Sequence, residues 1–453
     1  RDRLRSRGLG DVYKRQTQEM NLEKEDMYQI DGPLDMTVFF GFCGIKGYNH
    51  LRYPEAHPHS PWSILELKRT PETNIFDMIR EKDLLIHLPY ESFDESVVNF
   101  LYSAANDKDV LAIKQTLYRV SSSSPVVQAL EKAVQNGKQV TVLMEVKARF
   151  DEANNILMAR RLEKAGAHVI YGLVGLKTHS KCTLVIRREK DGIRRYVHVA
   201  TGNYNASTAK LYTDLGILTC NDRFGIDASA FFNLLSGYSD PPIWDSFIVA
   251  PINLRQRCIE LIDREIHFAK NGEDAHMIAK MNSLLDKGII EKLYEASQAG
   301  VKIELIVRGI CVLIPGIPGV SDNITVRSIV GRFLEHSRIF WFRNGGREEL
   351  YISSADWMPR NLNDRVELMV PIEDPEIKRR LKQMVDIELS DNQKAHIMQA
   401  DGTWLKTISA ENQLCAQEYF QKIAEKRDAE DEMTLAQKLE PYTPVLGHGD
   451  GSD

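Results

Sequence analysis

The chain has 453 residues, of which 43% are hydrophobic and 27% are charged, and its net charge is -6. These values are ordinary for a folded protein of two or three domains, and the negative charge argues against a general nucleic-acid binder. The six cysteines form no Cys-x-x-Cys pair, which excludes the usual zinc-binding spacing, and the chain has no run of 18 apolar residues.

The amino-terminal part is not predicted to form a domain of its own. Residues 1–16 are basic and lack apolar periodicity, and we interpret them as a non-native or artefactual segment. Residues 17–62 contain a turn and a proline-rich stretch, and we interpret them as the end of a larger domain.

From residue 63 to residue 246 predicted strands and helices alternate, which is typical of α/β proteins. Two helices are predicted, each followed by a glycine that commonly ends a helix, at 125–136 and 155–165. Apolar runs predict strands at 109–118, 139–146, 168–171, 182–186 and 195–200.

The stretch Gly175–Lys181 carries the strongest chemical signal in this region. It places His179 between Lys177 and Lys181, directly before the predicted strand 182–186. An imidazole at a strand start can attack phosphorus, and lysines two residues to either side would share its strand face and neutralise phosphate oxygens. The alternative is a surface histidine in a basic turn.

The same pattern returns later in the chain. Residues 129–146 align without gaps on residues 292–309, and the segment 200–205 has a counterpart at 353–357. Between these landmarks, Gly175…His179-Ser180-Lys181 is repeated as Gly331…His336-Ser337-Arg338. Three landmarks in the same order predict two copies of one α/β unit, which we place at 63–246 and 247–430.

The second unit ends in predicted helices at 375–385, for which Asp374 is the expected N-cap, and at 409–426. After residue 430 the chain becomes acidic and then rich in proline and glycine. Residues 431–453 are therefore predicted to be disordered.

A duplicated fold can bring His179 and His336 to one pseudo-twofold axis. One imidazole would then act as the nucleophile and the other as an acid, a base or an electrostatic partner. Lys181 and Arg338 follow the two histidines by two residues and would stabilise phosphate oxygens. The alternative is two unrelated core histidines.

Further cations lie at predicted strand ends, at Arg119, Lys147, Arg149 and Arg308. Residues 137–198 also hold thirteen Lys or Arg residues against six Asp or Glu residues. Because arginine binds phosphate in a planar, bidentate manner, this arrangement predicts a tunnel for a polyanion. Each arginine alone could instead be a surface or ion-paired residue.

The chain has no P-loop motif and no metal-binding His-Glu-x-x-His motif. A nucleotide would therefore have to be bound by residues other than a P-loop. Tyr212 could stack on a base or belong to the core. Asp214 could orient a histidine or be structural.

Several blocks of this sequence together match one family. They are Leu88-Pro89-Tyr90-Glu91-Ser92-Phe93 and the residues 112–119, 146–152, 175–181, 201–205, 211–214 and 307–311. From residue 17 to residue 430 the chain resembles bacterial polyphosphate kinase of the first class, which shares its catalytic fold with the phospholipase D superfamily. The resemblance implies an α/β fold of two tandem phospholipase D-like domains around a pseudo-twofold active site, preceded at 17–62 by a remnant of a helical domain.

The resemblance also implies roles for single residues. His179 matches the histidine that becomes phosphorylated, and His198 matches a second important histidine of the same half. His336 matches a histidine that lies at the nucleotide, and Tyr212 and Arg308 match positions that contact ATP.

Arg119 and Arg149 match positions that the family associates with magnesium. Because a guanidinium cannot ligate a cation, we interpret them as holding phosphate oxygens that themselves bind Mg²⁺. Ile186 stands where the phospholipase D pattern has an aspartate, which favours phosphoryl transfer over diester hydrolysis. The family's amino-terminal domain, which contributes a nucleotide contact, has no counterpart in this sequence, so the ATP site is expected to be incomplete.

The predicted function is that of an ATP:polyphosphate phosphotransferase, which transfers the γ-phosphate of ATP reversibly to inorganic polyphosphate through phosphohistidine at His179. The expected ligands are ATP or ADP, polyphosphate and Mg²⁺. We expect a cytoplasmic homo-oligomer without nucleic acid and with at most peripheral contact with the inner membrane. The alternatives are a phospholipase D-type phosphodiesterase, with water as the acceptor, and a non-catalytic polyanion-binding protein.

Overall fold

The structure, a computed structural model, describes residues 15, 17–28, 35–61, 64–65, 73–121, 123–146, 152–237 and 243–438. The chain forms two compact units, Arg1–Ala56 and His57–Asp453. The described part of the first unit contains the short 3₁₀ helices η1 (Lys24–Asp26), η2 (Thr37–Gly44) and η3 (Asn49–Leu51). The division between the units falls inside the segment 17–62, and the domain boundaries proposed from the sequence stay predictions.

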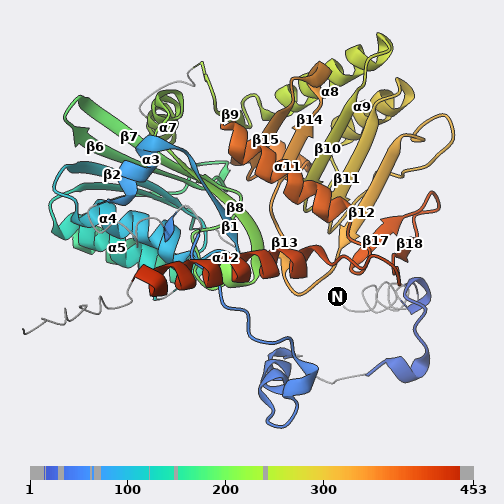
Figure 1. Ribbon diagram of the computed structural model, residues 1–453, viewed down its shortest axis with the longest axis horizontal. Coiled ribbons are helices and arrows are strands. Elements are labelled where there is room, and N and C mark those ends of the chain that lie inside the picture. The colour runs from blue at the N-terminus through green and yellow to red at the C-terminus, as the bar shows by residue number, and fades with distance from the viewer. Residues whose placement is uncertain are drawn as a thin grey trace, which may run out of the picture. The chain divides into compact units, whose positions relative to one another are not determined.

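The first half of the second unit is built on one mixed sheet (Figure 1). Its strands in spatial order are β1 (Leu84–Leu88), β8 (Tyr212–Thr219), β7 (Gly192–Ala200), β6 (Cys182–Glu189), β2 (Val110–Leu117), β3 (Gln139–Met144) and β4 (His168–Tyr171). The helical elements are α3 (Ile75–Glu81), η4 (Asp94–Val98), α4 (Asn99–Asn106), α5 (Pro125–Gln135), α6 (Glu152–Ala165), η5 (Thr208–Lys210) and α7 (Asp222–Leu235). Strands β2, β3 and β4 are parallel because α5 and α6 return the chain between them.

The second half is built on a second mixed sheet. Its strands in spatial order are β18 (Trp404–Lys406), β17 (Ala395–Met398), β12 (Ile324–Ile329), β11 (Lys302–Val307), β10 (His276–Met281), β14 (Ile339–Phe342), β15 (Glu349–Ser353) and β16 (Arg365–Pro371), with β9 (Ile248–Ala250) paired to β16. The helical elements are α8 (Leu254–Lys270), α9 (Lys287–Gln298), η6 (Asn344–Gly346), α10 (Pro359–Asn363), α11 (Pro375–Leu389) and α12 (Ala416–Lys438).

The two halves have the same topology. The order β8-β7-β6-β2-β3-β4 in the first sheet corresponds to β16-β15-β14-β10-β11-β12 in the second. The aligned sequence blocks form α5 and β3 in the first half and α9 and β11 in the second. The α/β fold with an internal duplication, predicted from the sequence, is therefore confirmed.

Matching local signals form the repeated helix in each half. The Ser124 side chain accepts a hydrogen bond from the Val127 N–H at the start of α5, and Asp286 accepts one from the Ile289 N–H at the start of α9. The aligned residues Leu130 and Leu293 are fully buried. Burial of each such side chain stabilises the fold by roughly 1.5–3 kcal/mol.

The halves also exchange a short strand. Strand β5 (Lys177–Thr178), directly before His179, pairs in parallel with β16 of the second half. Strand β13 (Leu334–Glu335), directly before His336, pairs in parallel with β8 of the first half. Each histidine thus follows a strand that pairs with the other half's sheet.

The carboxyl-terminal helices differ in part from the prediction. Helix α11 begins after Asp374, whose side chain caps it as expected. Helix α12 begins at Ala416 instead of 409, because residues near Ser409 bond back to Asn392 and Gln393 instead of forming helical turns. It continues to Lys438, past residue 430, through a sequence rich in Glu, Ala, Lys and Gln, which are strong helix formers. The rest of the predicted disordered tail lies outside the described residues.

Within the described ranges, every helix is too short or too polar to cross a membrane.

Candidate active site

His179 lies between β5 and β6, where the second half fixes its backbone. The N–H groups of His179 and Ser180 both donate to the carbonyl oxygen of Val366 on β16, at 2.9 Å. The His179 residue is 7% exposed. The histidine is therefore positioned by a strand that lies far along the chain.

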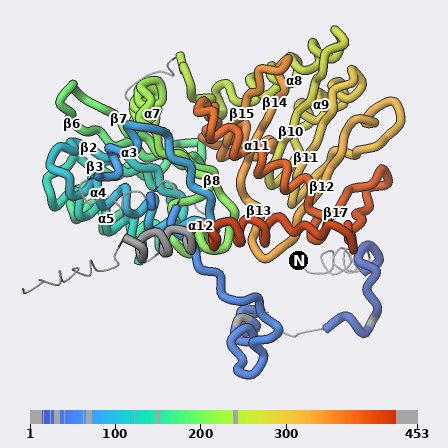
Figure 2. The backbone as a smooth tube through the Cα atoms, in the orientation of Figure 1, coloured from blue at the N-terminus to red at the C-terminus, as the bar shows by residue number. Residues whose placement is uncertain are grey.

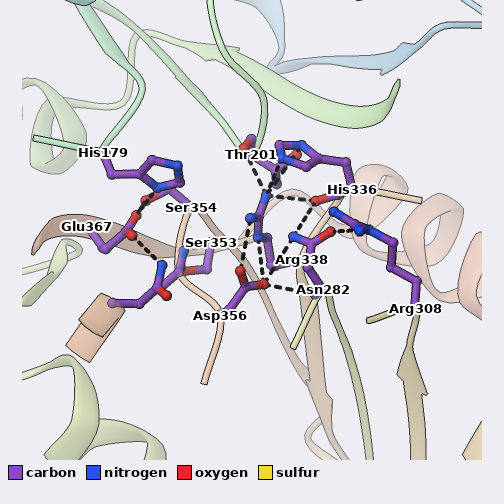
Figure 3. A network of polar contacts seen from close by, with 12 residues as sticks. His179, Thr201, Asn282, Arg308, His336, Arg338, Ser353, Ser354, Asp356 and Glu367 are labelled. Atoms are coloured by element: carbon purple, nitrogen blue, oxygen red, sulfur yellow. Dashed lines mark hydrogen bonds and ion pairs between the residues drawn. The ribbon is translucent and has the colours of Figure 1, made fainter. Parts of the chain in front are cut away.

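A carboxylate of the second half orients the His179 ring (Figure 3). His179 Nδ1 lies 2.8 Å from Glu367 Oε2 on β16. The Ser354 hydroxyl donates to the same carboxylate oxygen, and Asn361 Nδ2 donates to the other at 2.6 Å. Glu367 is therefore surrounded by donors, as suits an ionised carboxylate that accepts an N–H from the imidazole.

His336 repeats this arrangement with the halves interchanged. Its Nδ1 lies 2.8 Å and 2.9 Å from the two carboxylate oxygens of Asp214, which is on β8 of the first half. The Thr201 hydroxyl donates to Asp214 Oδ1 at 2.6 Å. Asp214 is the third residue of β8, as Glu367 is the third residue of β16. The prediction that Asp214 orients a histidine agrees with this contact.

A cation follows each histidine and binds that histidine's own carbonyl oxygen. Lys181 Nζ donates to the carbonyl of His179, and Arg338 donates to the carbonyl of His336 at 2.7 Å. Arg338 also donates from Nε to Asp356 Oδ1 at 3.1 Å. Figure 3 shows Arg338 and Asp356 together, close to His336.

Burial keeps both imidazoles neutral. It lowers the pKa of His179 well below the ordinary value, and Lys181, Arg365 and Arg338 lower that pKa further. Burial also lowers the pKa of His336, which Asp214 partly opposes. Because cations of both halves act on His179, the two halves share one electrostatic site.

Burial and neighbouring charges also shift the pKa values of Lys181, Asp214 and Asp356. Burial lowers the pKa of Lys181 to about 7. Burial raises the pKa of Asp214, but His336 outweighs it and the net pKa lies below the ordinary value. For Asp356 the same opposition, with Arg338 as the partner, gives a pKa of about 2. Asp214 and Asp356 are therefore ionised at neutral pH.

Two residues predicted to contact a nucleotide lie beside His336. The rings of Tyr212 and His336 are 5.2 Å apart. Arg308 Nε donates to Asn282 Oδ1 at 2.8 Å and to the carbonyl oxygen of Glu335 at 2.7 Å. The structure thus places Tyr212 and Arg308 close to the second histidine, and their contact with ATP stays a prediction.

Of the two residues predicted to act with magnesium, only Arg119 lies within the described residues. The Arg119 guanidinium lies 5.7 Å from the centre of the Tyr118 ring, and that ring meets the His179 ring edge-on at 5.0 Å. Arg149 and Lys147 lie outside the described residues. Within the described ranges, no group of three or more His, Cys, Asp or Glu residues could hold a metal ion.

His198 lies away from the contacts of the other two histidines. It is on β7, and its Nδ1 lies 2.8 Å from the hydroxyl of Tyr204. Burial lowers its pKa to about 3. It lines one small cavity with Asp214, so its closest link to the site is through that carboxylate. A direct role of His198 in the chemistry stays a prediction.

Sequence reasoning missed the supporting carboxylate Glu367 and its hydroxyl partner Ser354. Thr201 and Ser354 occupy corresponding places, since the N–H groups of Leu215 and Leu368 donate to their hydroxyl oxygens, each at 3.0 Å. Extending the repeat alignment from Asp214 would have indicated Glu367.

Two family descriptions match the two halves of the chain. Residues 74–241 match polyphosphate kinase C-terminal domain 1, and residues 247–417 match polyphosphate kinase C-terminal domain 2.

Curated relatives agree with this assignment. The chain is 56% identical over 378 residues to a polyphosphate kinase of Halalkalibacterium halodurans. This alignment covers 83% of this chain and 53% of the relative. It is 51% identical over 393 residues to a polyphosphate kinase of Bacillus anthracis, covering 86% of this chain and 55% of the relative. The chain therefore spans about half the length of the curated relatives it matches.

A solved structure has the same fold. The crystal structure of polyphosphate kinase from Porphyromonas gingivalis superimposes with a TM-score of 0.80 at 34% identity, over 93% of this chain and 64% of that one.

Proposed function

The chain belongs to the polyphosphate kinase family, and from that premise we propose that it transfers the terminal phosphoryl group of ATP reversibly to polyphosphate through phosphohistidine at His179. The observation that carries this proposal is the buried, neutral His179 whose Nδ1 is held by Glu367. In this tautomer Nδ1 carries the proton and Nε2 carries the free electron pair.

In the first step His179 Nε2 attacks the γ-phosphorus of ATP. The N–P bond forms while the bond from phosphorus to the β–γ bridging oxygen breaks, and ADP leaves. The proton on Nδ1 stays in its hydrogen bond to Glu367, whose negative charge stabilises the cationic ring of the phosphohistidine.

In the second step a terminal oxygen of polyphosphate attacks the same phosphorus. The N–P bond breaks, and its electron pair returns to Nε2. Lys181 and Arg338, which both act electrostatically on His179, supply positive charge for the phosphate oxygens during this exchange. Because both steps use the same groups, the transfer is reversible.

The second histidine is proposed to act at the nucleotide. Asp214 holds the Nδ1–H of His336, and Nη1 of Arg338 lies 3.3 Å from Nε2 of the same ring. Tyr212 offers a ring face beside it, and Arg308 offers a planar guanidinium. We assign these three side chains to the bound nucleotide, with His336 assisting the departure of ADP.

The residues present do not fit a magnesium ion held by the protein, because the described site has cations and no cluster of three ligands. Any Mg²⁺ in the reaction is proposed to arrive on the phosphate oxygens, with Arg119 and Arg149 holding those oxygens. No step depends on it here. A cytoplasmic homo-oligomer with at most peripheral membrane contact is part of the same proposal.

The rival function is a phosphodiesterase in which His179 displaces one alcohol from a phosphodiester, and water then cleaves the N–P bond and releases a phosphomonoester. It is favoured by the same pair of histidines, each with a carboxylate on Nδ1. Release of an alcohol or a nucleotide from diesters without ATP would support it.

The test uses the longest natural chain that carries this sequence, incubated with γ-labelled ATP and Mg²⁺. The proposal expects protein-bound label that is acid-labile and alkali-stable, absent in His179→Ala, and chased by polyphosphate into acid-precipitable polymer. The matched variant His168→Ala, which removes an exposed histidine of the same half, should label like the parent. If neither parent nor variant is labelled while both still bind polyphosphate, the kinase mechanism is wrong.

A further inference from the structure

A separate cavity lies within the second unit, between the loop that follows β1 and the helices α11 and α12. Figure 2 traces α12 from the second half toward the first. The cavity has a volume of about 390 Å³, within the range of small-molecule sites. Its described lining residues include none of the active-site side chains.

One wall of the cavity is aromatic. The rings of His87 and Tyr90 are 4.6 Å apart, those of His87 and Phe420 are 5.1 Å apart, and those of Tyr90 and Phe420 are 5.5 Å apart. All three residues are buried. Such a wall offers faces and edges on which a planar ring can pack.

Two arginines and two acids line the cavity. Arg380 and Arg427 line it, together with the acids Glu91 and Asp386. Each acid already has a cation, since Glu91 binds Arg380 at 2.7 Å and Asp386 binds Lys382 at 2.7 Å. The contact with Glu91 uses one N–H of Arg380, and a guanidinium carries five.

Cations act on His87 in the aromatic wall. Burial lowers the pKa of His87 well below its ordinary value, and Arg380, Lys280 and Arg427 lower it further. The imidazole is therefore neutral, and three cations act at its position.

We propose that this cavity is a second ligand site, which binds an aromatic phosphate of about the size of a nucleoside monophosphate. The planar ring packs on His87, Tyr90 and Phe420, and the phosphate is held by Arg380 and Arg427.

One wall of the cavity contacts the chain segment that precedes His336. The Tyr90 ring meets the Phe333 ring edge-on at 5.6 Å. Gln417 on α12 binds both the N–H and the carbonyl of Phe333, each at 2.9 Å. Phe333 comes three residues before His336, so its contact with Tyr90 links one wall of the cavity to the active-site segment.

Photo-crosslinking locates the site directly. The intact chain is irradiated with 8-azido-AMP, with and without excess AMP, and labelled peptides are identified by mass spectrometry. We expect AMP-protected label on the peptides that carry Tyr90 or Phe420. Label confined to peptides that carry Tyr212, Arg308 or His336 would overturn the proposal, because it would place AMP only at the active site.

Calorimetry then tests the chemistry of recognition, in the His179→Ala background so that no transfer occurs. AMP should bind at least tenfold more tightly than adenosine or inorganic phosphate. The variant Ala424→Trp fills the cavity from α12 and should weaken AMP binding at least tenfold, whereas the exposed neighbour Lys422→Trp should not. Equal AMP affinity in both tryptophan variants would refute the site.

A charge variant tests the same site without filling the cavity, in case the tryptophan variant misfolds. Arg427→Gln should weaken AMP at least fivefold and leave adenosine unchanged, and equal loss for both would contradict the assigned phosphate position. These binding results do not require catalysis, so they stand or fall separately from the proposed kinase activity.

Discussion

Replacing Glu367 by glutamine removes one negative charge beside His179 with little change of shape. In the parent, Oε2 of Glu367 accepts from His179 and Ser354, and Oε1 accepts from Asn361. A glutamine oxygen can take the first position while its NH₂ faces Asn361. Asn361 can adapt by turning its amide, since its Oδ1 has no partner among the described residues.

The expected loss follows from the change in one hydrogen bond. A hydrogen bond to an ionised group contributes about 1.5–3 kcal/mol and a neutral one about 1 kcal/mol, so the cationic phosphohistidine ring loses roughly 1–2 kcal/mol. At about 1.4 kcal/mol per factor of ten, Glu367→Gln should slow phosphorylation roughly 5- to 30-fold.

Rapid-quench labelling with γ-labelled ATP measures this rate. The matched variant Glu349→Gln, which alters a half-buried carboxylate of the same half that binds Arg264, should label at the parental rate. Burial raises the pKa of Glu367, although Lys181 opposes it. If Glu367→Gln labels as fast as the parent, Glu367 is already protonated and the assigned electrostatic role is wrong.

Three further predictions concern other parts of the site. Because the pKa of Lys181 is about 7, its positive charge is present below that pH and lost above it, so the transfer rate should fall as pH rises through about 7. In Lys181→Arg the transfer rate, measured across the same pH range, should no longer show this fall. A pH profile that is unchanged in the variant would exclude Lys181 as the cause. A Cβ at Gly202 would lie 2.3 Å from Asp214, so Gly202→Ala should displace that carboxylate and reduce kcat at least tenfold, whereas Gly288→Ala, with its nearest contact at 3.5 Å, should leave kcat unchanged. Lys280 is buried between the carboxylates of Glu335 and Glu388. Lys280→Met should lower the free energy of unfolding in urea by about 3–5 kcal/mol, because both carboxylates would lose their shared cation. An unchanged urea midpoint would show that the carboxylates are protonated in the parent.

The repeated elements of the fold were predictable because each has a strong local signal. Apolar runs and glycine stops mark α5 and β3 and their counterparts α9 and β11. The exchanged strands β5 and β13 have two residues each, so they carry no periodicity that a sequence pattern could reveal. Their pairing depends on where the two sheets meet, which is a tertiary property.

The candidate site was predictable where chemistry and position coincide in one motif. His179 and His336 stand beside cations before strands, and this pattern is local. Glu367 was missed because it lies 188 residues from His179 and reaches it only through the exchange of strands. Within its own strand it looks like one acidic residue among apolar neighbours.

The central claim is that the second half orients His179 so that Nε2 receives the phosphoryl group. The most direct measurement is NMR of the protein labelled with ¹⁵N-histidine after incubation with ATP, with ³¹P–¹⁵N coupling used to identify the phosphorylated nitrogen. We expect a single phosphohistidine, at Nε2 of His179, which disappears in His179→Ala. Phosphate on Nδ1 of His179, or on His198 or His336, would contradict it.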